Sequence, residues 1–163
     1  MGPIVGSGPD NVWSFGRGGR MQQWNGQAWK ARAPLRTLGE AQAIHGTGPS
    51  DIWVATDTGV LHWNGGGWFE PKMGTSLSDD VTGVYAASPT EVWVTSSFHD
   101  AIYRFDGAGF VEAFSTGSVD LYGIHGASAT DLWAVGKAGQ AVHSDGTTWT
   151  PQPTGGDASL NAV

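Results

Sequence analysis

A tryptophan recurs every 40 residues along this chain, and this spacing constrains the fold more than any other feature of the sequence. The four copies stand at Trp13, Trp53, Trp93 and Trp133. An aliphatic residue precedes each of them, and before it stands a polar residue, at Asn11, Asp51, Glu91 and Asp131. A fixed period that runs through 163 residues indicates four copies of one supersecondary unit.

Two further blocks repeat with the tryptophan. An upstream block opens on an aliphatic residue at Ile4, Ile44, Val84 and Ile124. A downstream block has the pattern aromatic–Asn/Asp–Gly–x–x–aromatic and occupies residues 24–29, 63–68 and 105–110, with a fourth copy at 144–149 that begins with Ser. Three matching blocks in each copy exclude a chance similarity.

Each copy contains the signals for four short strands. A Pro-containing turn precedes a strand such as Ile52–Ala55, which is apolar at every position and is therefore expected to be buried on both faces. The Asn-Gly or Asp-Gly pair of the downstream block is a strong hairpin signal. Four such strands in about 40 residues are typical of a β-propeller blade.

The sequence therefore predicts an all-β chain that forms a single β-propeller unit. Its blades are expected at about residues 3–36, 41–74, 81–115 and 121–153, and residues 157–163 are expected to start a next blade or to form a clasp strand. We expect the repeated tryptophans to be buried between neighbouring blades; the alternative is a ladder of rings that stack on a ligand.

The composition excludes several other classes of protein. Glycine makes up 26 of the 163 residues, which disfavours a helical bundle, and nine tryptophans disfavour disorder. The net charge of −7, without a basic cluster, disfavours nucleic-acid binding. No apolar run approaches the roughly 18 residues of a membrane span. The absence of cysteine excludes disulfides and thiolate metal sites.

Propellers usually have about four to eight blades, so three arrangements fit the sequence. They are a closed ring of four blades, half of an eight-blade ring completed by a second chain, and a piece of a longer protein. An open stack would expose an apolar blade face at each end, which favours association. We therefore expect completion by another chain, such as a homodimer, or by further sequence.

The string from Gly48 to Trp68 resembles a bacterial propeller repeat that reads roughly "GSGPDDVWAVGDGGTILHWDGTAW" and is common in large surface or secreted proteins of myxobacteria. The strand plan is also similar to tectonin-type, tachylectin-type and Photorhabdus-type propeller lectins. These resemblances imply a propeller fold, an extracellular or cell-surface location, and sugar binding between blades.

The aromatic turns are the strongest candidates for a ligand site. An exposed ring can stack on a sugar while the neighbouring Asn, Asp or His bonds its hydroxyl groups. The candidate residues are Trp24, Asn25, Trp29, His62, Trp63, Asn64, Trp68, Phe105, Asp106, Phe110, His143, Asp145 and Trp149. In the alternative interpretation the aromatic pairs only stabilise their hairpins, and the polar residues form the solvated face of an outer strand.

Other polar residues are interpreted as structural. His45 and His125 occupy equivalent first-strand positions, but they lack the further ligands that a zinc site needs. The extra residues at 96–100, which include His99 and Asp100, indicate a longer surface loop.

These observations favour a non-catalytic binding propeller. The leading hypothesis is a multivalent, lectin-like carbohydrate-binding protein that acts through avidity. The alternative is a structural or protein-interaction scaffold. No acid–base–nucleophile set stands out among the repeated copies, so we expect neither an enzyme nor a cofactor.

Overall fold

The computed structural model describes residues 2–32, 39–73 and 80–163. These residues form four consecutive antiparallel sheets and contain no α-helix, only two single-turn 3-10 helices, η1 (Arg17–Gly19) and η2 (Lys137–Gly139). The all-β propeller architecture predicted from the repeat is confirmed. Within the described ranges, no helix is long and apolar enough to cross a membrane.

Each sheet is a meander of strands that follow one another along the chain. The first contains β1 (Ile4–Gly8), β2 (Asn11–Gly16), β3 (Arg20–Trp24) and β4 (Trp29–Arg32). The second contains β5 (Ala41–Gly48), β6 (Asp51–Thr56), β7 (Gly59–Trp63) and β8 (Trp68–Phe69). The third contains β10 (Val81–Ser88), β11 (Glu91–Ser96), β12 (Ala101–Phe105) and β13 (Gly109–Ser115). The fourth contains β14 (Leu121–Ser128), β15 (Asp131–Gly136), β16 (Ala141–Ser144) and β17 (Trp149–Pro151).

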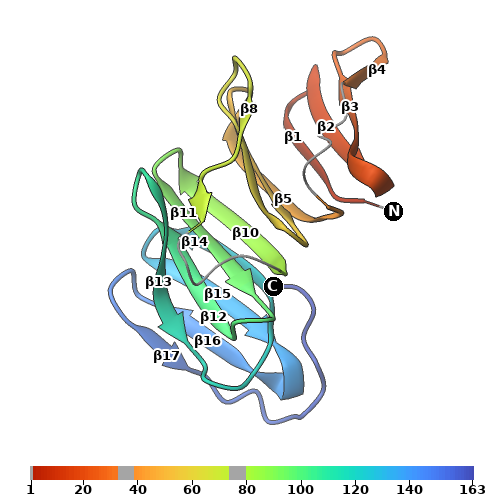
Figure 1. Ribbon diagram of the computed structural model, residues 1–163. Helices are drawn as coiled ribbons and strands as arrows, with labels where there is room; N and C mark the ends of the chain where they lie inside the picture. The colour runs from red at the N-terminus through yellow and green to blue at the C-terminus, as the bar shows by residue number, and fades with distance from the viewer. Residues whose placement is uncertain (1, 33–38, 74–79) are drawn as a thin grey trace.

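The four sheets follow one another around an arc, with the first strand of each on the inner side (Figure 1). A short strand, β9 (Lys72–Met73), follows the second sheet along the chain and pairs in parallel with β13 at the outer edge of the third sheet. This pairing adds a fifth strand to the third sheet and ties two neighbouring sheets together.

The pairing register repeats from sheet to sheet. The tryptophan of each second strand lies opposite the second residue of the upstream block, in the pairs Val5–Trp13, His45–Trp53, Tyr85–Trp93 and His125–Trp133. All six residues of β6 are buried, which confirms that a strand apolar at every position is covered on both faces.

The core lies between the sheets, where Trp13 and Trp53 reach the aromatic turn of the following sheet. The Trp13 ring centroid lies 5.5 Å from both Trp63 and Trp68. Trp53 lies 5.0 Å from Phe105 and 6.1 Å from Phe110. The third interface contains Trp93, Leu132 and Val142, with Trp149 packed at its margin.

The fourth tryptophan has no following sheet to receive it. Trp13, Trp53 and Trp93 are between 0% and 4% exposed, whereas Trp133 is 38% exposed. The predicted burial of the tryptophans between blades therefore holds for the first three, and Trp133 departs from it because it lies on the outer face of the last sheet.

The final residues run beside this last sheet without forming a strand. The backbone N–H of Leu160 donates to the Gly136 carbonyl at 2.9 Å, and Asn161 and Ala162 lie against Gly123 of β14. A role as a next blade or a clasp strand stays a prediction, as do the exact blade boundaries. The predicted ends of the first two blades, at residues 36 and 74, fall outside the described residues.

Truncating a buried tryptophan should cost far more stability than truncating its exposed equivalent. We expect Trp53→Ala to lower the free energy of unfolding by about 3–5 kcal/mol, because it opens a cavity between two sheets. Trp133→Ala, at the same repeat position, should cost less than about 1 kcal/mol. Urea unfolding at low protein concentration compares the two, and equal losses would contradict the packing scheme.

Candidate functional site

A polar contact between the second and third strands repeats in all four sheets. It joins the residue two positions before the tryptophan to the third-strand residue that lies opposite the tryptophan. The pairs are Gln23 Nε2 to Asn11 Oδ1 at 2.7 Å, His62 Nε2 to Asp51 Oδ1 at 2.6 Å, Arg104 Nη2 to Glu91 Oε1 at 2.6 Å, and His143 Nε2 to Asp131 Oδ1 at 2.8 Å. His62 and His143, predicted as ligand-binding residues, are therefore bonded within their own sheets.

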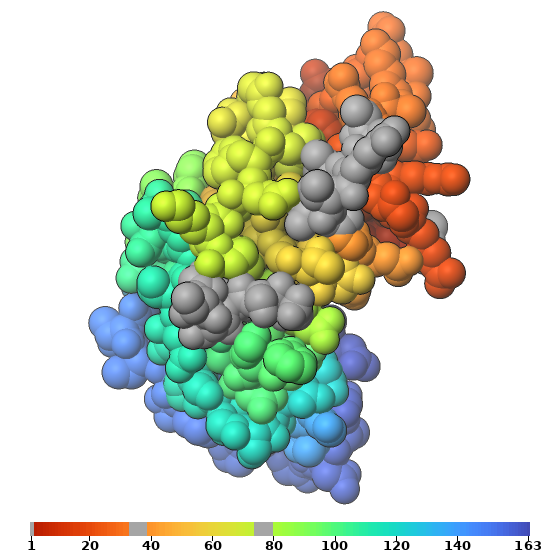
Figure 2. All heavy atoms as spheres, in the orientation of Figure 1, coloured from red at the N-terminus to blue at the C-terminus, as the bar shows by residue number. Residues whose placement is uncertain are grey.

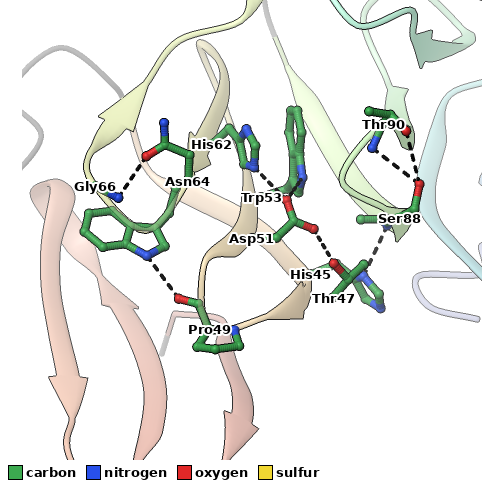
Figure 3. Close-up of polar contacts among 12 residues, drawn as sticks. His45, Thr47, Pro49, Asp51, Trp53, His62, Asn64, Gly66, Ser88 and Thr90 are labelled. Atoms are coloured by element: carbon green, nitrogen blue, oxygen red, sulfur yellow. Dashed lines mark hydrogen bonds and ion pairs between the residues drawn. The ribbon is translucent and has the colours of Figure 1, made fainter.

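The second sheet carries the fullest version of this network (Figure 3). Asp51 accepts from Thr47 Oγ1 at 2.5 Å, from Trp53 Nε1 at 2.9 Å and from His62. The His62 ring stacks on Trp53 with centroids 3.8 Å apart and an angle of 10° between the planes. Burial opposes ionisation of Asp51, but these hydrogen bonds outweigh it and lower the pKa of the carboxyl group. Asp51 and His62 are buried and bonded to each other, so the network stabilises the blade.

The polar side chain of each aromatic turn accepts hydrogen bonds from backbone N–H groups of the same turn. The side-chain oxygen of Asn25, Asn64, Asp106 and Asp145 each accepts from two backbone N–H groups two and three residues onward. For Asp106, the N–H groups of Ala108 and Gly109 lower the pKa of the carboxyl group. These four predicted sugar-binding groups are Asx-type turn caps in the structure.

The rings of the aromatic turns differ in exposure from one sheet to the next. Phe110 is 2% exposed and Phe105 8%, which leaves neither ring a free face for a ligand. Trp63 and Trp68 are half-buried against Trp13, and Trp149 packs at the edge of the third interface.

The first sheet alone has no preceding sheet in this chain. Its Trp29 is 46% exposed, and the ring lies 5.9 Å from that of half-buried Trp24. Of the predicted ring pairs, Trp24 and Trp29 are therefore the ones that remain open to a ligand.

A second cluster lies where the inner strands of three sheets meet. His45 of β5, Tyr85 of β10 and His125 of β14 are in mutual ring contact, with centroid distances of 4.9, 5.2 and 5.8 Å. His45 Nδ1 accepts a hydrogen bond from the backbone N–H of Ala86 at 3.2 Å. Burial lowers the pKa of His45, and repulsion from a positive charge on His125 lowers it further.

The histidines of this cluster line a groove of about 270 Å³. Its walls come from β5, β10, β14 and residues 161–163. The repeat predicts equivalent structural roles for His45 and His125. Their contact could not be predicted, because only the curvature of the arc brings positions two blades apart together. In the described part of the chain no three His, Cys, Asp or Glu side chains are grouped so as to hold a metal ion.

The longer loop of the third sheet folds onto its own residues. The backbone N–H of His99 donates to Ser96 Oγ at 3.2 Å, and its ring contacts Phe98 at 4.9 Å and Tyr103 at 6.5 Å. Phe98 is 67% exposed at the tip.

Comparisons with known proteins identify the fold. No protein-family model matches the sequence, and no curated protein matches it significantly. Among solved structures, YCF48 from Cyanidioschyzon merolae is similar, with 17% identity, a TM-score of 0.72 and coverage of 97% of this chain and 58% of that one. YCF48 bound to D1 peptide gives 18% identity, a TM-score of 0.68, and coverage of 91% of this chain and 51% of that one.

Two further structures broaden this result. A catalytically inactive virginiamycin B lyase from Staphylococcus aureus with quinupristin gives 18% identity, a TM-score of 0.76, and coverage of 99% of this chain and 59% of that one. The computationally designed Ika8 protein gives 13% identity, a TM-score of 0.72 and coverage of 97% and 50%. The chain thus spans between half and three fifths of the length of these structures.

The buried and exposed copies of the polar network provide one test. Asp51→Ala should lower the free energy of unfolding by about 2–3 kcal/mol, because it leaves His62, Thr47 and Trp53 without their acceptor. Asp131→Ala removes an equivalent aspartate whose side chain is 52% exposed, and should cost below about 1 kcal/mol. Chemical denaturation measures both losses in the free energy of unfolding. A larger loss for Asp131→Ala than for Asp51→Ala would contradict the stabilising role of the buried network.

The lowered pKa of His45 gives a second test. The fold favours neutral His45, so the unfolded chain binds a proton first as the pH falls below about 6.5. The free energy of unfolding should therefore decrease from pH 6.5 downward, and His45→Gln should remove this part of the dependence. NMR titration of the imidazole gives the midpoint directly, and a midpoint at or above 6.5 would contradict the burial of the ring.

Proposed function

We propose that this chain is a non-catalytic binding scaffold that holds a protein or peptide segment in the groove on its inner strands. The observation that carries the proposal is one groove to which three different sheets contribute, with the rings of His45 and His125 in its lining and in contact with each other. Tyr85 contacts both rings but is itself buried. His125 is exposed, so its ring is available to a partner.

The chemistry of the groove favours a neutral partner. None of its lining side chains is Lys, Arg, Asp or Glu. The imidazole rings offer flat faces for peptide planes or apolar side chains, and Gln42, Tyr122 and Asn161 offer polar groups at the walls. A short segment with uncharged polar and apolar side chains matches this lining. The similarity in fold to YCF48 bound to D1 peptide supports a peptide partner.

The absence of catalysis is part of the same proposal. Among the described residues, Asp51, Glu91 and Asp131 each bond the third strand of their own sheet, which supports structural roles for them. One similar structure is a lyase, so a measured turnover would overturn this part.

Carbohydrate binding is the second candidate, at the pair Trp24 and Trp29. Trp29 is 46% exposed and can offer a ring face to a sugar. The other aromatic turns lie between or beside sheets, which favours one such site over four identical sites. An extracellular or cell-surface location also stays a proposal, and it rests on the resemblance of the repeat alone.

A peptide library and a glycan array, probed with the same labelled protein, test the two candidates. We expect enriched uncharged peptides and a blank array. His125→Ala should weaken peptide binding by about tenfold, roughly the loss of one buried aromatic contact. Trp29→Ala, on the outer end of the first sheet, is the control and should leave peptide affinity unchanged.

The opposite pattern would support the lectin. Concentration-dependent binding to one sugar class, lost in Trp29→Ala and kept in His125→Ala, would overturn the groove proposal. Circular dichroism of both variants confirms that each remains folded.

A further inference from the structure

We infer that the two open ends of the arc are complementary, and that two copies of this chain associate head to tail. In this arrangement Trp133 of one copy inserts against Trp24 and Trp29 of the other. The inference concerns surfaces remote from the groove and does not depend on the proposed function.

The interfaces inside the chain provide the template. In the first two, the tryptophan of one sheet meets the aromatic turn of the next, as Trp13 meets Trp63 and Trp68 at 5.5 Å. The same junction is built from Trp53 with Phe105 and Phe110. One residue projects and two rings receive it, so the contact has a direction and its two sides differ.

Each end of the arc carries one half of such a contact, without its counterpart. The last sheet presents Trp133, 38% exposed, at the position of Trp13 and Trp53. The first sheet presents Trp24 and Trp29 at the position of Trp63 and Trp68. In Figure 2 the first sheet, red to orange, and the last sheet, blue, stand at opposite ends of the molecule. The two halves lie at opposite ends of one chain, so a second copy can bring a projecting and a receiving half together.

The charge distribution favours the same pairing. Residues 1–40 contain five Lys or Arg and two Asp or Glu, whereas residues 121–163 contain one Lys and three Asp. The first sheet is therefore net positive in an otherwise acidic chain, and the last sheet is net negative. Opposite net charges steer the unlike ends together and keep like ends apart.

The contact should be weaker than the internal ones. On the face that would receive a preceding sheet, the first sheet has Ser14 and Gln22 where the second has Val54 and Leu61. Less apolar area is then buried, so we expect the two copies to separate at low protein concentration.

Sedimentation velocity over a range of protein concentrations tests the inference. The wild-type chain should approach twice its mass of 17.1 kDa as the concentration rises, and added salt should weaken the association. Trp133→Ala and Trp29→Ala should each raise the dissociation constant at least tenfold. Phe98→Ala, which removes another exposed ring from a loop between the ends, should leave it unchanged.

Mixing the two variants distinguishes a directed contact from a symmetric one. Trp133→Ala keeps the receiving rings and Trp29→Ala keeps the projecting ring, so the mixture retains one intact junction and should associate more tightly than either variant alone. A wild-type chain that stays monomeric, an unaffected Trp29→Ala variant, or a mixture without rescue would each overturn the inference. Growth beyond two chains would contradict closure of the pair.

Discussion

Contacts between a tryptophan and the aromatic turn of the next sheet hold the stacked sheets together. A single four-stranded sheet of about 40 residues cannot bury enough apolar surface to be stable. Stacking places rings such as Trp53 and Phe110 at 0% and 2% exposure. The inner strands must approach closely for this, and a Cβ atom on Gly83 would lie 2.7 Å from Thr95 Oγ1 and 3.1 Å from the Ile124 backbone nitrogen.

Much of this fold could be predicted from the sequence, because the period fixes the strands and their order. The Asn-Gly and Asp-Gly turns set the hairpins, and the apolar run of β6 indicated a strand covered on both faces. The parallel pairing of β9 with β13 could not be predicted, because two residues in a connector carry no strand pattern. Nor does the repeat indicate that the last residues lie against β14 without forming a strand.

The site was harder to predict, because exposure depends on the neighbouring sheet as well as on the residue itself. Trp29 and Phe110 hold the same place in the repeat, yet one is 46% exposed and the other 2%. The ring cluster of His45, Tyr85 and His125 depends likewise on the curvature of the arc. His45 and His125 are separated by 80 positions in the sequence, and only the arc brings their ring centroids to 5.8 Å. A repeat therefore predicts well which residues build each sheet. It predicts poorly which copies stay exposed and which residues of distant sheets meet.

A double-mutant cycle at the second interface measures whether the ring contact holds the two sheets together. Trp53→Leu and Phe105→Leu alter rings whose centroids lie 5.0 Å apart in different sheets. If the contact joins the sheets, the two losses in the free energy of unfolding should be coupled by about 0.5–1.5 kcal/mol. Additive losses, within about 0.3–0.5 kcal/mol, would mean that each ring stabilises its own sheet independently and that the contact does not join the sheets.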